Sequence, residues 1–373
     1  MDTVTHLSTV HYRYDTRIFY KQCRSLVNEG YSVNLVVADS KGKEIKDGIN
    51  IIDVAKSNSS RVSKILTATA HIILNRPNLV HIHDPELIFS GLLFKALGIP
   101  VIFDMHEHLP KQILNKQWIP NWARKPLSGT WNLIERITLP FFSVVMAESS
   151  YEKYYPWIRR KIIVQNYPDA KLIPNHTRKF DIFTVGYIGS VTKERGAITV
   201  AAAIGMLRDK GVMVNFQCLG PVSTEVRDNE HFSRGIDEGW LQAPGRVKGS
   251  EGWTTISRCH VGVAVLAPIP NYVESWPTKM FEYMSMSMPV IVSNFPLYEE
   301  LVASTQCGIT VDPHKTSDIA EAIEFIASEP AIADTMGACG RAAVISKYSW
   351  DAEVGRLISL YRKIGTPRST VVL

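Results

Sequence analysis

Residues 264–293 read AVLAPIPNYVESWPTKMFEYMSMSMPVIVS, which contains a complete strand, helix and strand in succession. An apolar run of strand length ends in a proline-broken loop, a helical pattern follows, and a second apolar run closes the stretch. Parallel strands need a crossover of this kind, which is usually a helix. The stretch therefore predicts an α/β fold with a parallel sheet.

The same alternation extends along the chain in both directions. In the first half the expected helices are 16–29, 60–74 and 86–97, and the expected strands are 31–38, 79–83, 100–104, 142–147 and 162–166. Residues 167–181 contain two prolines and no apolar periodicity, which predicts a linker, and a second strand–helix series begins at 183–188. We expect two doubly wound domains, at residues 1–170 and 180–348, with a final helical segment, 349–373, crossing back to the first domain.

The composition is that of an ordinary globular protein. The 373 residues are 45% hydrophobic and 21% charged, which excludes a disordered, collagen-like or membrane-bundle chain. The five cysteines are scattered without a Cys-x-x-Cys pair, which argues against a disulfide framework or a zinc cage and fits a reducing cytoplasm. The sequence contains neither a bilayer-spanning apolar run nor a secretory signal pattern, so we expect a cytoplasmic location.

Positive charge is concentrated in the first half. Residues 1–175 hold 22 of the 41 Lys and Arg residues but 15 of the 36 Asp and Glu residues. A basic half is compatible with nucleic acid, an anionic membrane or a phosphorylated substrate, and charge alone does not choose among these partners.

The helix in the stretch 264–293 begins with the features of an anion site. Pro277 suits the first helical position, where the free N–H groups of neighbouring residues carry the positive end of the helix dipole. Lys279 adds a full positive charge beside them. Glu274 and Glu282 would repel a phosphate unless they accept hydrogen bonds from sugar hydroxyls. A solvated pair of Lys279 and Glu282 is the alternative.

Residues 274–282, ESWPTKMFE, together with the Pro-Val-Ile strand that follows, resemble the donor-binding motif of retaining glycosyltransferases of family 4. That family has the GT-B fold, in which two Rossmann-like domains, the first for the acceptor and the second for the nucleotide sugar, face a central cleft. The resemblance implies that Glu282 binds the ribose of the nucleotide and that Glu274 contacts the donor sugar. It also implies that Lys279 and the helix start hold the diphosphate. The remaining donor-binding residues at this helix start are Ser275 and Trp276.

Residues 184–204, TVGYIGSVTKERGAITVAAAI, are similar to the opening of the family's second domain. Arg195 stands where the family usually has lysine, so its charge is expected to neutralise the developing diphosphate. Gly189 supplies the glycine turn, and Lys193 is expected to replace an arginine that often follows this turn. The segment APGRVKGSEGW resembles the loop that faces the nucleotide base, with Val247 as the expected contact. Loop solubility for the two basic residues and an ordinary turn for the segment are the alternatives.

Polar residues follow two expected strands of the first half, at His83-Asp84 and at Asp104-Met105-His106-Glu107. Carboxyl ends of strands are where doubly wound sheets bind their ligands. The resemblance implies that His106 approaches the donor sugar, and Asp84 and Glu107 are candidates for the same cleft. A histidine satisfied within the core is the alternative. A zinc site is not expected, because neither a His-x-x-x-His pattern nor a cysteine pair accompanies these residues, and the resemblance implies that no bound metal is needed.

The loop STVHYRYDTRIF precedes the first expected helix and resembles a branch of the family with an Asp-x-Arg-Ile pattern. Asp15 and Arg17 are therefore candidates to face the cleft. A helix N-cap and a solvated helix face explain these two residues equally well.

Residues 108–142 interleave basic residues with tryptophans, a combination that suits a lipid headgroup layer. The residues concerned are Lys111, Lys116, Arg124, Lys125 and Arg136 with Trp118, Trp122 and Trp131. We expect this segment to contact an anionic membrane surface. A helix that packs its tryptophans into the core is the alternative, and no nucleic-acid-binding signature accompanies the segment.

Together these features predict a peripheral membrane enzyme that moves a hexose from a nucleotide diphosphate sugar to a carbohydrate or lipid-linked glycan acceptor. The resemblance implies retention of configuration, no cofactor, and a role in bacterial surface polysaccharide biosynthesis, such as that of lipopolysaccharide. Lys279 and Arg195 would stabilise the leaving group, while Glu274 and His106 would fix the sugar. A sugar-nucleotide epimerase and a non-catalytic, membrane-associated nucleotide-sugar-binding protein are the alternatives.

Overall fold

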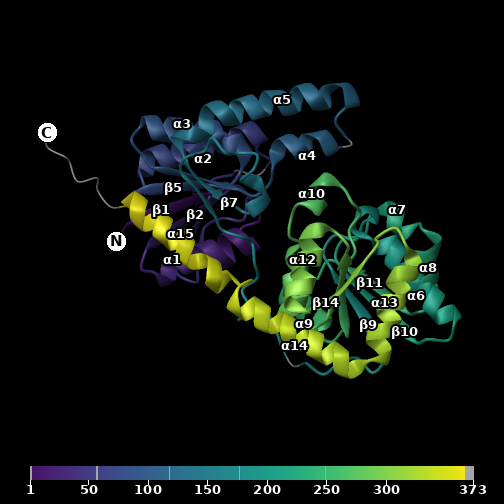
Figure 1. Ribbon diagram of the computed structural model, residues 1–373. Helices are drawn as coiled ribbons and strands as arrows, with labels where there is room; N and C mark the ends of the chain where they lie inside the picture. Colours follow the sequence, from purple (N-terminus) through teal and green to yellow (C-terminus); the bar gives the residue numbers. More distant parts are fainter. Residues whose placement is uncertain (1, 56–57, 117, 176, 248, 366–373) are drawn as a thin grey trace. The chain divides into compact units, whose positions relative to one another are not determined.

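The computed structural model describes residues 2–55, 58–116, 118–175, 177–247 and 249–365, and the chain divides into two compact units (Figure 1). Unit 1 takes the residues up to Asn166 and again those from Glu353, and unit 2 takes Tyr167–Ala352. Helix α15, Trp350–Gly365, therefore begins in unit 2 and contributes most of its length to unit 1.

Unit 1 is built on an eight-stranded sheet in the order β3-β4-β2-β1-β5-β6-β7-β8. All neighbouring strands are parallel except β3 and β4. The strands are β1 Thr3–Leu7, β2 Ser32–Val37, β3 Glu44–Lys46, β4 Ile49–Asp53, β5 Leu79–Ile82, β6 Val101–Met105, β7 Ser143–Met146 and β8 Lys161–Ile163. In the central pair, His6 of β1 lies in register with His81 of β5, so these two side chains share one face of the sheet.

The helices of unit 1 connect these strands and cover the sheet. They are η1 Thr16–Cys23, α1 Arg24–Asn28, α2 Arg61–Asn75, η2 Pro85–Leu87, α3 Ile88–Ala96, α4 Leu109–Asn115, α5 Asn121–Thr138, η3 Leu139–Phe141 and η4 Ser149–Tyr151. Buried residues of α2, α3 and the central strands form one apolar core. This crossover pattern brings the ends of β1, β5 and β6 to the same edge of the sheet.

The first helix differs from the expected one. Instead of one α-helix over 16–29, the chain forms a π-helix, η1, followed by the short α1, and Tyr20 donates its backbone N–H to the carbonyl of Asp15 five residues earlier. The wider turn changes which side chains face inward. Arg17 and Lys21, which an α-helical pattern places on the solvated side, are 2% and 6% exposed. The alternative reading of Arg17 as part of a solvated helix face is therefore wrong.

Unit 2 is built on a six-stranded parallel sheet in the order β11-β10-β9-β12-β13-β14. Its strands are β9 Phe183–Ile188, β10 Val214–Leu219, β11 Leu241–Gly245, β12 Val261–Ala264, β13 Val290–Ser293 and β14 Gly308–Val311. Its helices are η5 Lys193–Arg195, α6 Ala197–Asp209, α7 Thr224–Arg227, α8 Glu230–Asp237, α9 Gly249–Ser257, α10 Pro270–Val273, α11 Thr278–Ser285, α12 Pro296–Thr305, α13 Thr316–Ser328 and α14 Pro330–Ser346. Two apolar clusters form the core of this unit. Two sheets with helical crossovers, parallel apart from the β3–β4 pair, confirm the predicted α/β class.

None of the helices in the described ranges combines the length with the apolar character needed to cross a bilayer.

Candidate functional site

Helix α11 is fixed tightly to the sheet of unit 2. A Cβ atom on Gly262 of β12 would lie 2.2 Å from the Tyr283 ring, so this close approach requires glycine. The Tyr283 hydroxyl accepts a hydrogen bond from the backbone N–H of Ile188 at 3.0 Å. Pro277 is the N-cap of α11 and not its first helical residue, a shift of one position from the expectation. The helix start is thereby held beside the end of β9.

Lys279, in the first turn of α11, is buried. Its Nζ atom lies 3.8 Å from the centroid of the ring of Tyr187, a residue of β9. No described residue forms a hydrogen bond with this Nζ atom. Burial and the nearby Arg195 guanidinium lower the pKa of Lys279 well below its ordinary value. A buried amine that packs on a π-face and has no hydrogen-bond partner among the described residues is available to an added anion.

Arg195 approaches the same point. Gly189 follows β9 with a φ of 123°, and a Cβ atom there would lie 3.5 Å from Lys279 Nζ and 3.6 Å from Arg195 Nη1. Arg195 Nε donates to the Tyr272 hydroxyl at 3.3 Å, which holds the guanidinium in place. Two basic side chains therefore converge on a backbone turn that has no side chain of its own. Arg195 disfavours the charged form of Lys279, and an anion that binds between the two favours it.

Further residues predicted to bind the nucleotide sugar lie around Lys279, in the loop before α11 and on the helix itself. Ser275 donates its hydroxyl to the carbonyl of Asn271, and the Trp276 ring packs at 6.0 Å, between centroids, against Tyr298. Glu274 and Glu282 are half-buried, and the charge of Glu282 acts on Lys279. These residues occupy the loop and helix that carry Lys279.

Lys193 and Val247 do not join the two basic side chains at Gly189. The Lys193 ammonium, 64% exposed, pairs with Glu225 at 3.0 Å. Val247 is half-buried and packs against the apolar cluster that includes α11. The structure thus gathers Gly189, Arg195 and Lys279 and leaves Lys193 on the surface.

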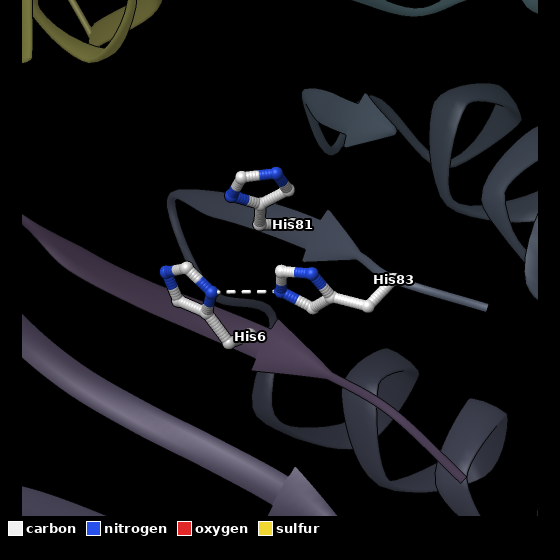
Figure 2. A group of neighbouring side chains, drawn as sticks. All are labelled: His6, His81 and His83. Atoms are coloured by element: carbon white, nitrogen blue, oxygen red, sulfur yellow. Dashed lines mark hydrogen bonds between the residues drawn. The ribbon is translucent and has the colours of Figure 1, made fainter. Parts of the chain in front are cut away.

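In unit 1, three histidines lie side by side on two neighbouring strands of the sheet (Figure 2). His6 comes from β1, while His81 and His83 come from β5 and the residue after it. Since alternate residues of a strand share a face, the His-x-His pattern places both rings next to His6. His6 Nδ1 and His83 Nε2 are 2.9 Å apart, and burial lowers the pKa of all three rings.

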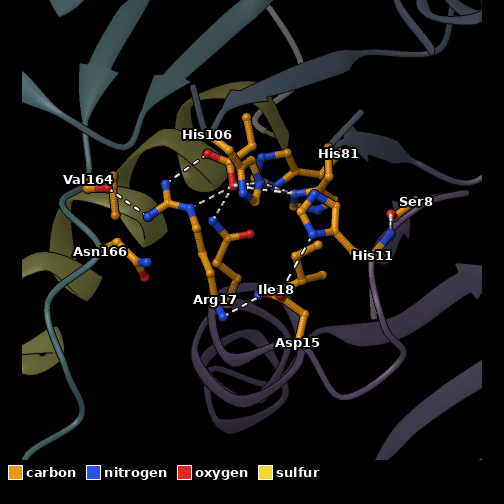
Figure 3. Close-up of polar contacts among 12 residues, drawn as sticks. Ser8, His11, Asp15, Arg17, Ile18, His81, His106, Val164 and Asn166 are labelled. Atoms are coloured by element: carbon orange, nitrogen blue, oxygen red, sulfur yellow. Dashed lines mark hydrogen bonds and ion pairs between the residues drawn. The ribbon is translucent and has the colours of Figure 1, made fainter. Parts of the chain in front are cut away.

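Asp104, at the end of β6, is contacted by several polar side chains, among them Arg17 and His106, which Figure 3 labels. Arg17 makes a two-pronged contact with it, at 2.9 Å from Nε and 2.8 Å from Nη2, and Gln22 donates at 2.7 Å. His83 Nδ1 and His106 Nε2 lie 3.3 Å and 3.1 Å from the same carboxylate oxygen. Burial alone would raise the pKa of Asp104, but Arg17 and His106 hold it well below its ordinary value. Asp104 is therefore an ionised centre for His106.

Two further carboxylates, Asp84 and Asp15, lie near Asp104, and both are close to the His11 ring. Asp84 is buried and accepts hydrogen bonds from the Ser8 hydroxyl at 3.0 Å and the Thr9 backbone N–H at 2.5 Å. Asp15 caps η1 by accepting the backbone N–H groups of residues 17 and 18, which is the N-cap role that the sequence left open. His11 lies 3.6 Å from Asp15 and 3.7 Å from Asp84. Burial alone would lower the pKa of His11, but the two carboxylates raise it above its ordinary value.

Comparison with known proteins shows the family. Residues 16–155 match the family described as Glycosyltransferase Family 4, and residues 182–329 match Glycosyl transferases group 1. The chain belongs to glycosyltransferase family 4. It is accordingly an enzyme that transfers a sugar from a nucleotide sugar.

Curated relatives of this family 4 glycosyltransferase are distant. It is similar to glycogen synthase of Mycobacterium tuberculosis, with 20% identity over 77% of this chain and 69% of the relative. It is also similar to CapM, a capsular polysaccharide biosynthesis glycosyltransferase of Staphylococcus aureus, with 26% identity over 48% of this chain and 46% of the relative.

Solved structures share the fold over nearly the full length of the glycosyltransferase. Sucrose-phosphate synthase from Thermosynechococcus elongatus is 17% identical, with a TM-score of 0.74 over 98% of this chain and 99% of that chain. HepE of Anabaena, in complex with UDP and glucose, is 11% identical, with a TM-score of 0.73 over 97% and 100% of the two chains. The predicted GT-B fold is thus confirmed.

Two groups of described side chains in the glycosyltransferase have the chemistry of metal ligands, His6 with His81 and His83, and His83 with Asp104 and His106. In the second group the three facing atoms are 3.1 to 3.3 Å apart, which also suits a tetrahedral ion. Both oxygens of Asp104, however, already accept hydrogen bonds from Arg17, whose charge balances the carboxylate.

Sequence reasoning missed several residues of the glycosyltransferase network. Glu107 is exposed and accepts a hydrogen bond from Gln112, outside the Asp104 contacts. Gln22 and Tyr361 were not anticipated, although both contact the network. The alternation of His81 and His83 on one strand was a usable signal for the histidine cluster, whereas nothing local marks Tyr361.

Proposed function

We propose that the enzyme transfers a hexose, with retention of anomeric configuration, from a nucleoside diphosphate sugar to a carbohydrate or lipid-linked glycan acceptor. The observation that carries the proposal is the pair of basic side chains at Gly189, formed by the buried Lys279 amine and the Arg195 guanidinium. A diphosphate supplies two adjacent anionic groups, which matches two adjacent basic groups above a glycine turn.

The basic groups at Gly189 are suited to stabilising the nucleoside diphosphate as it leaves the sugar. When the glycosidic bond to the diphosphate breaks, negative charge grows on the leaving oxygen. Lys279, Arg195 and the N-terminus of α11 are already in place to stabilise it, so no reorganisation is needed as the charge develops. Because side chains supply this charge, we expect transfer to continue in the presence of a metal chelator.

The remaining residues receive roles consistent with their chemistry. We assign Glu282 to the ribose and Glu274 to the transferred sugar, because carboxylates accept hydrogen bonds from vicinal hydroxyls. Ser275 and Trp276 shape the loop beside them. Val247 and Lys193 are assigned to the base and to the outer phosphate.

In unit 1 we assign His106 to the donor sugar, with Asp104 as its ionised partner. Asp84, Asp15 and Glu107 are assigned to acceptor hydroxyls. Arg17 serves this site by holding Asp104.

The acceptor is proposed to be a bacterial surface polysaccharide or its lipid-linked precursor. The similarity to CapM supports a polysaccharide product, and the similarity to glycogen synthase supports a carbohydrate acceptor. HepE is seen with UDP and glucose, so UDP-glucose is the first donor to test.

We further propose that α4 and α5 rest on the anionic cytoplasmic face of a membrane. These helices pack on each other, and Trp118 and Trp122 between and within them are 78% and 81% exposed (Figure 1). Apolar side chains along α5 are exposed as well, namely Leu127, Leu133 and Ile137. Trp131 instead packs inward and donates its indole N–H to Glu135 at 2.9 Å, so it is not part of this surface.

The test of the proposed reaction has two stages. Thermal unfolding is first measured with a panel of nucleotide sugars, because a bound donor raises the melting temperature by mass action. The stabilising donor, carrying a labelled sugar, is then incubated with and without glycan acceptors. Label in the acceptor with its anomeric configuration kept supports the proposal. Acceptor-free conversion of the donor to its epimer, or binding without turnover, would contradict it.

A further inference from the structure

A continuous chain of polar contacts joins Tyr361, on α15, to Asp104 at the end of β6. The Tyr361 hydroxyl lies 3.2 Å from His6 Nε2, and His6 Nδ1 lies 2.9 Å from His83 Nε2. His83 Nδ1 then lies 3.3 Å from Asp104 Oδ2. The Tyr361 hydroxyl also lies 2.6 Å from His81 Nδ1. All of these side chains are buried, so each proton in the chain has a definite place.

Asp104 sets the direction of the chain. Ionised Asp104 only accepts hydrogen bonds, so the nitrogen of His83 that faces it, Nδ1, carries a proton. In a neutral ring the other nitrogen, Nε2, is then an acceptor, and His6 donates to it from Nδ1. His6 Nε2 is in turn an acceptor for the Tyr361 O–H group.

The contacts of Tyr361 and His81, at the other end of this series of hydrogen bonds, agree with the same donor-to-acceptor order. The Tyr361 oxygen accepts from His81 Nδ1, which leaves His81 Nε2 as a bare lone pair. This Nε2 atom is buried and has no hydrogen-bond partner among the described residues. In the reverse order it would be a buried N–H without an acceptor, and the lone pair of His83 would face the Asp104 carboxylate. An unmatched buried donor and a lone pair against an anion are both unfavourable.

Arg17 does not fix the tautomer of His83, as the series of contacts from Tyr361 does. Its guanidinium holds the two oxygens of Asp104, and Gln22 adds a third donor. Neither side chain contacts the His83 ring through a hydrogen bond in the part of the chain that the structure describes. The tautomer of His83 is therefore set from the opposite side, through His6.

We propose that Tyr361 is a positioning residue for His106, acting by fixing the tautomers of His6 and His83. The inference rests on the proposed function in one respect, the role of His106 toward the donor sugar. His106 Nε2 lies 3.1 Å from Asp104 Oδ2 and 3.2 Å from His83 Nδ1. If the proton moved from Nδ1 to Nε2 of His83, its lone pair would repel the carboxylate oxygen that also holds His106. The last helix of the chain thus controls the geometry at the end of β6.

The tautomers are tested first in the unaltered protein. Nitrogen NMR of protein labelled with ¹⁵N-histidine distinguishes a protonated ring nitrogen from an unprotonated one. We expect His6, His81 and His83 to carry their protons on Nδ1. A proton on Nε2 of His83, a charged His83 ring at neutral pH, or one zinc ion per chain in the purified protein would each overturn the proposal. This measurement does not depend on whether any donor is turned over.

The variant Tyr361→Phe removes the hydroxyl and keeps the ring. We expect a mixture of tautomers at His6 and His83, and a fall in kcat of about tenfold with the KM for donor within about twofold, because one oriented hydrogen bond is lost from the positioning of a reacting group. Tyr31→Phe is the matched control, since its ring packs on Tyr361 at 6.0 Å between centroids. We expect it to change neither the spectrum nor kcat.

The outcomes separate the two proposals. If Tyr361→Phe leaves the nitrogen signals of His83 unchanged, the positioning role is wrong, whatever happens to kcat. If His106→Ala retains full activity while Tyr361→Phe alters the His83 signals, the proposed role of His106 is wrong and the tautomer chain stands.

Discussion

The Nζ atom of Lys279 lies 3.8 Å from the centroid of the Tyr187 ring, directly beside the turn at Gly189. The ring faces one side of the amine, and Arg195 approaches from another. Lys279 is therefore held in a position where it gains a full partner only when an anion arrives. This relationship has consequences for proton uptake and for turnover.

Binding of a nucleoside diphosphate should be accompanied by proton uptake. Burial and Arg195 lower the pKa of free Lys279, and a diphosphate would raise it again by supplying the missing negative charge. At pH values between the lowered pKa and the ordinary value of about 10.4, the protein takes a proton from the buffer on binding. Calorimetry in two buffers with different ionisation enthalpies measures this uptake.

The matched variant for this measurement is Lys279→Met, which keeps the length and apolar stem of the side chain. We expect the variant to bind nucleotide without proton uptake and to lose about 10²-fold in kcat, the typical cost of removing one preorganised donor to a developing anion. Equal proton uptake by the two proteins would show that another group titrates.

Replacing Glu282 with alanine should weaken nucleotide binding. If the carboxylate accepts hydrogen bonds from ribose hydroxyls, its loss raises the Kd for a nucleoside diphosphate by about tenfold. Glu300→Ala, on the exposed side of α12, is the control and should leave the Kd unchanged. An unaltered Kd in Glu282→Ala, measured by calorimetry, would remove the ribose assignment.

The exposed tryptophans predict binding to anionic vesicles. Serine at Trp118, Trp122, Arg124 and Lys125 removes the interfacial rings and two charges, so co-sedimentation with phosphatidylglycerol vesicles should be lost. Ile45→Ser is the control, because Ile45 is 78% exposed on β3, away from these helices. Raised salt should also release the unaltered protein. Undiminished co-sedimentation of the fourfold variant would exclude this surface as the membrane contact.

Local patterns were sufficient for the parts of the site that lie on regular elements. The strand expected at 183–188 is β9, Phe183–Ile188, and the helix expected from 277 is α11, Thr278–Ser285. Each of these two stretches shows the apolar pattern of only one kind of element, a strand or a helix. The proline predicts the start of the helix to within one residue. The convergence of Gly189, Arg195 and Lys279 could not be predicted without the strand order of the sheet, because β9 and β12 are neighbours in space but distant in sequence.

Two features of unit 1 could not be predicted from the sequence, and the reasons are physical. Arg17 is buried because η1 is a π-helix, and a pattern read at 3.6 residues per turn assigns its inward face wrongly. Tyr361 reaches His6 across 355 residues of sequence, a contact set by packing of α15 and by no local motif.

The final prediction concerns Glu135, on the inner side of α5. Its carboxyl is buried, and burial raises the pKa of Glu135 to about 7 although Tyr155 and Trp131 donate hydrogen bonds to it. The unfolded chain releases this proton near the ordinary pKa of about 4.3, so the folded state alone retains it between that value and about 7. Stability from this group is complete below the ordinary pKa and is lost as the pH rises through 7.

We therefore expect the free energy of unfolding, measured with urea at several pH values, to fall by about 3 kcal/mol between pH 4.5 and 8 from this group. Glu135→Gln keeps the shape and can still bond to both aromatic partners, and it removes the titration. The difference in stability between the variant and the unaltered protein should thus grow in favour of the variant as the pH rises. A constant difference between Glu135→Gln and the unaltered protein across this range would mean that Glu135 titrates at its ordinary value despite its burial.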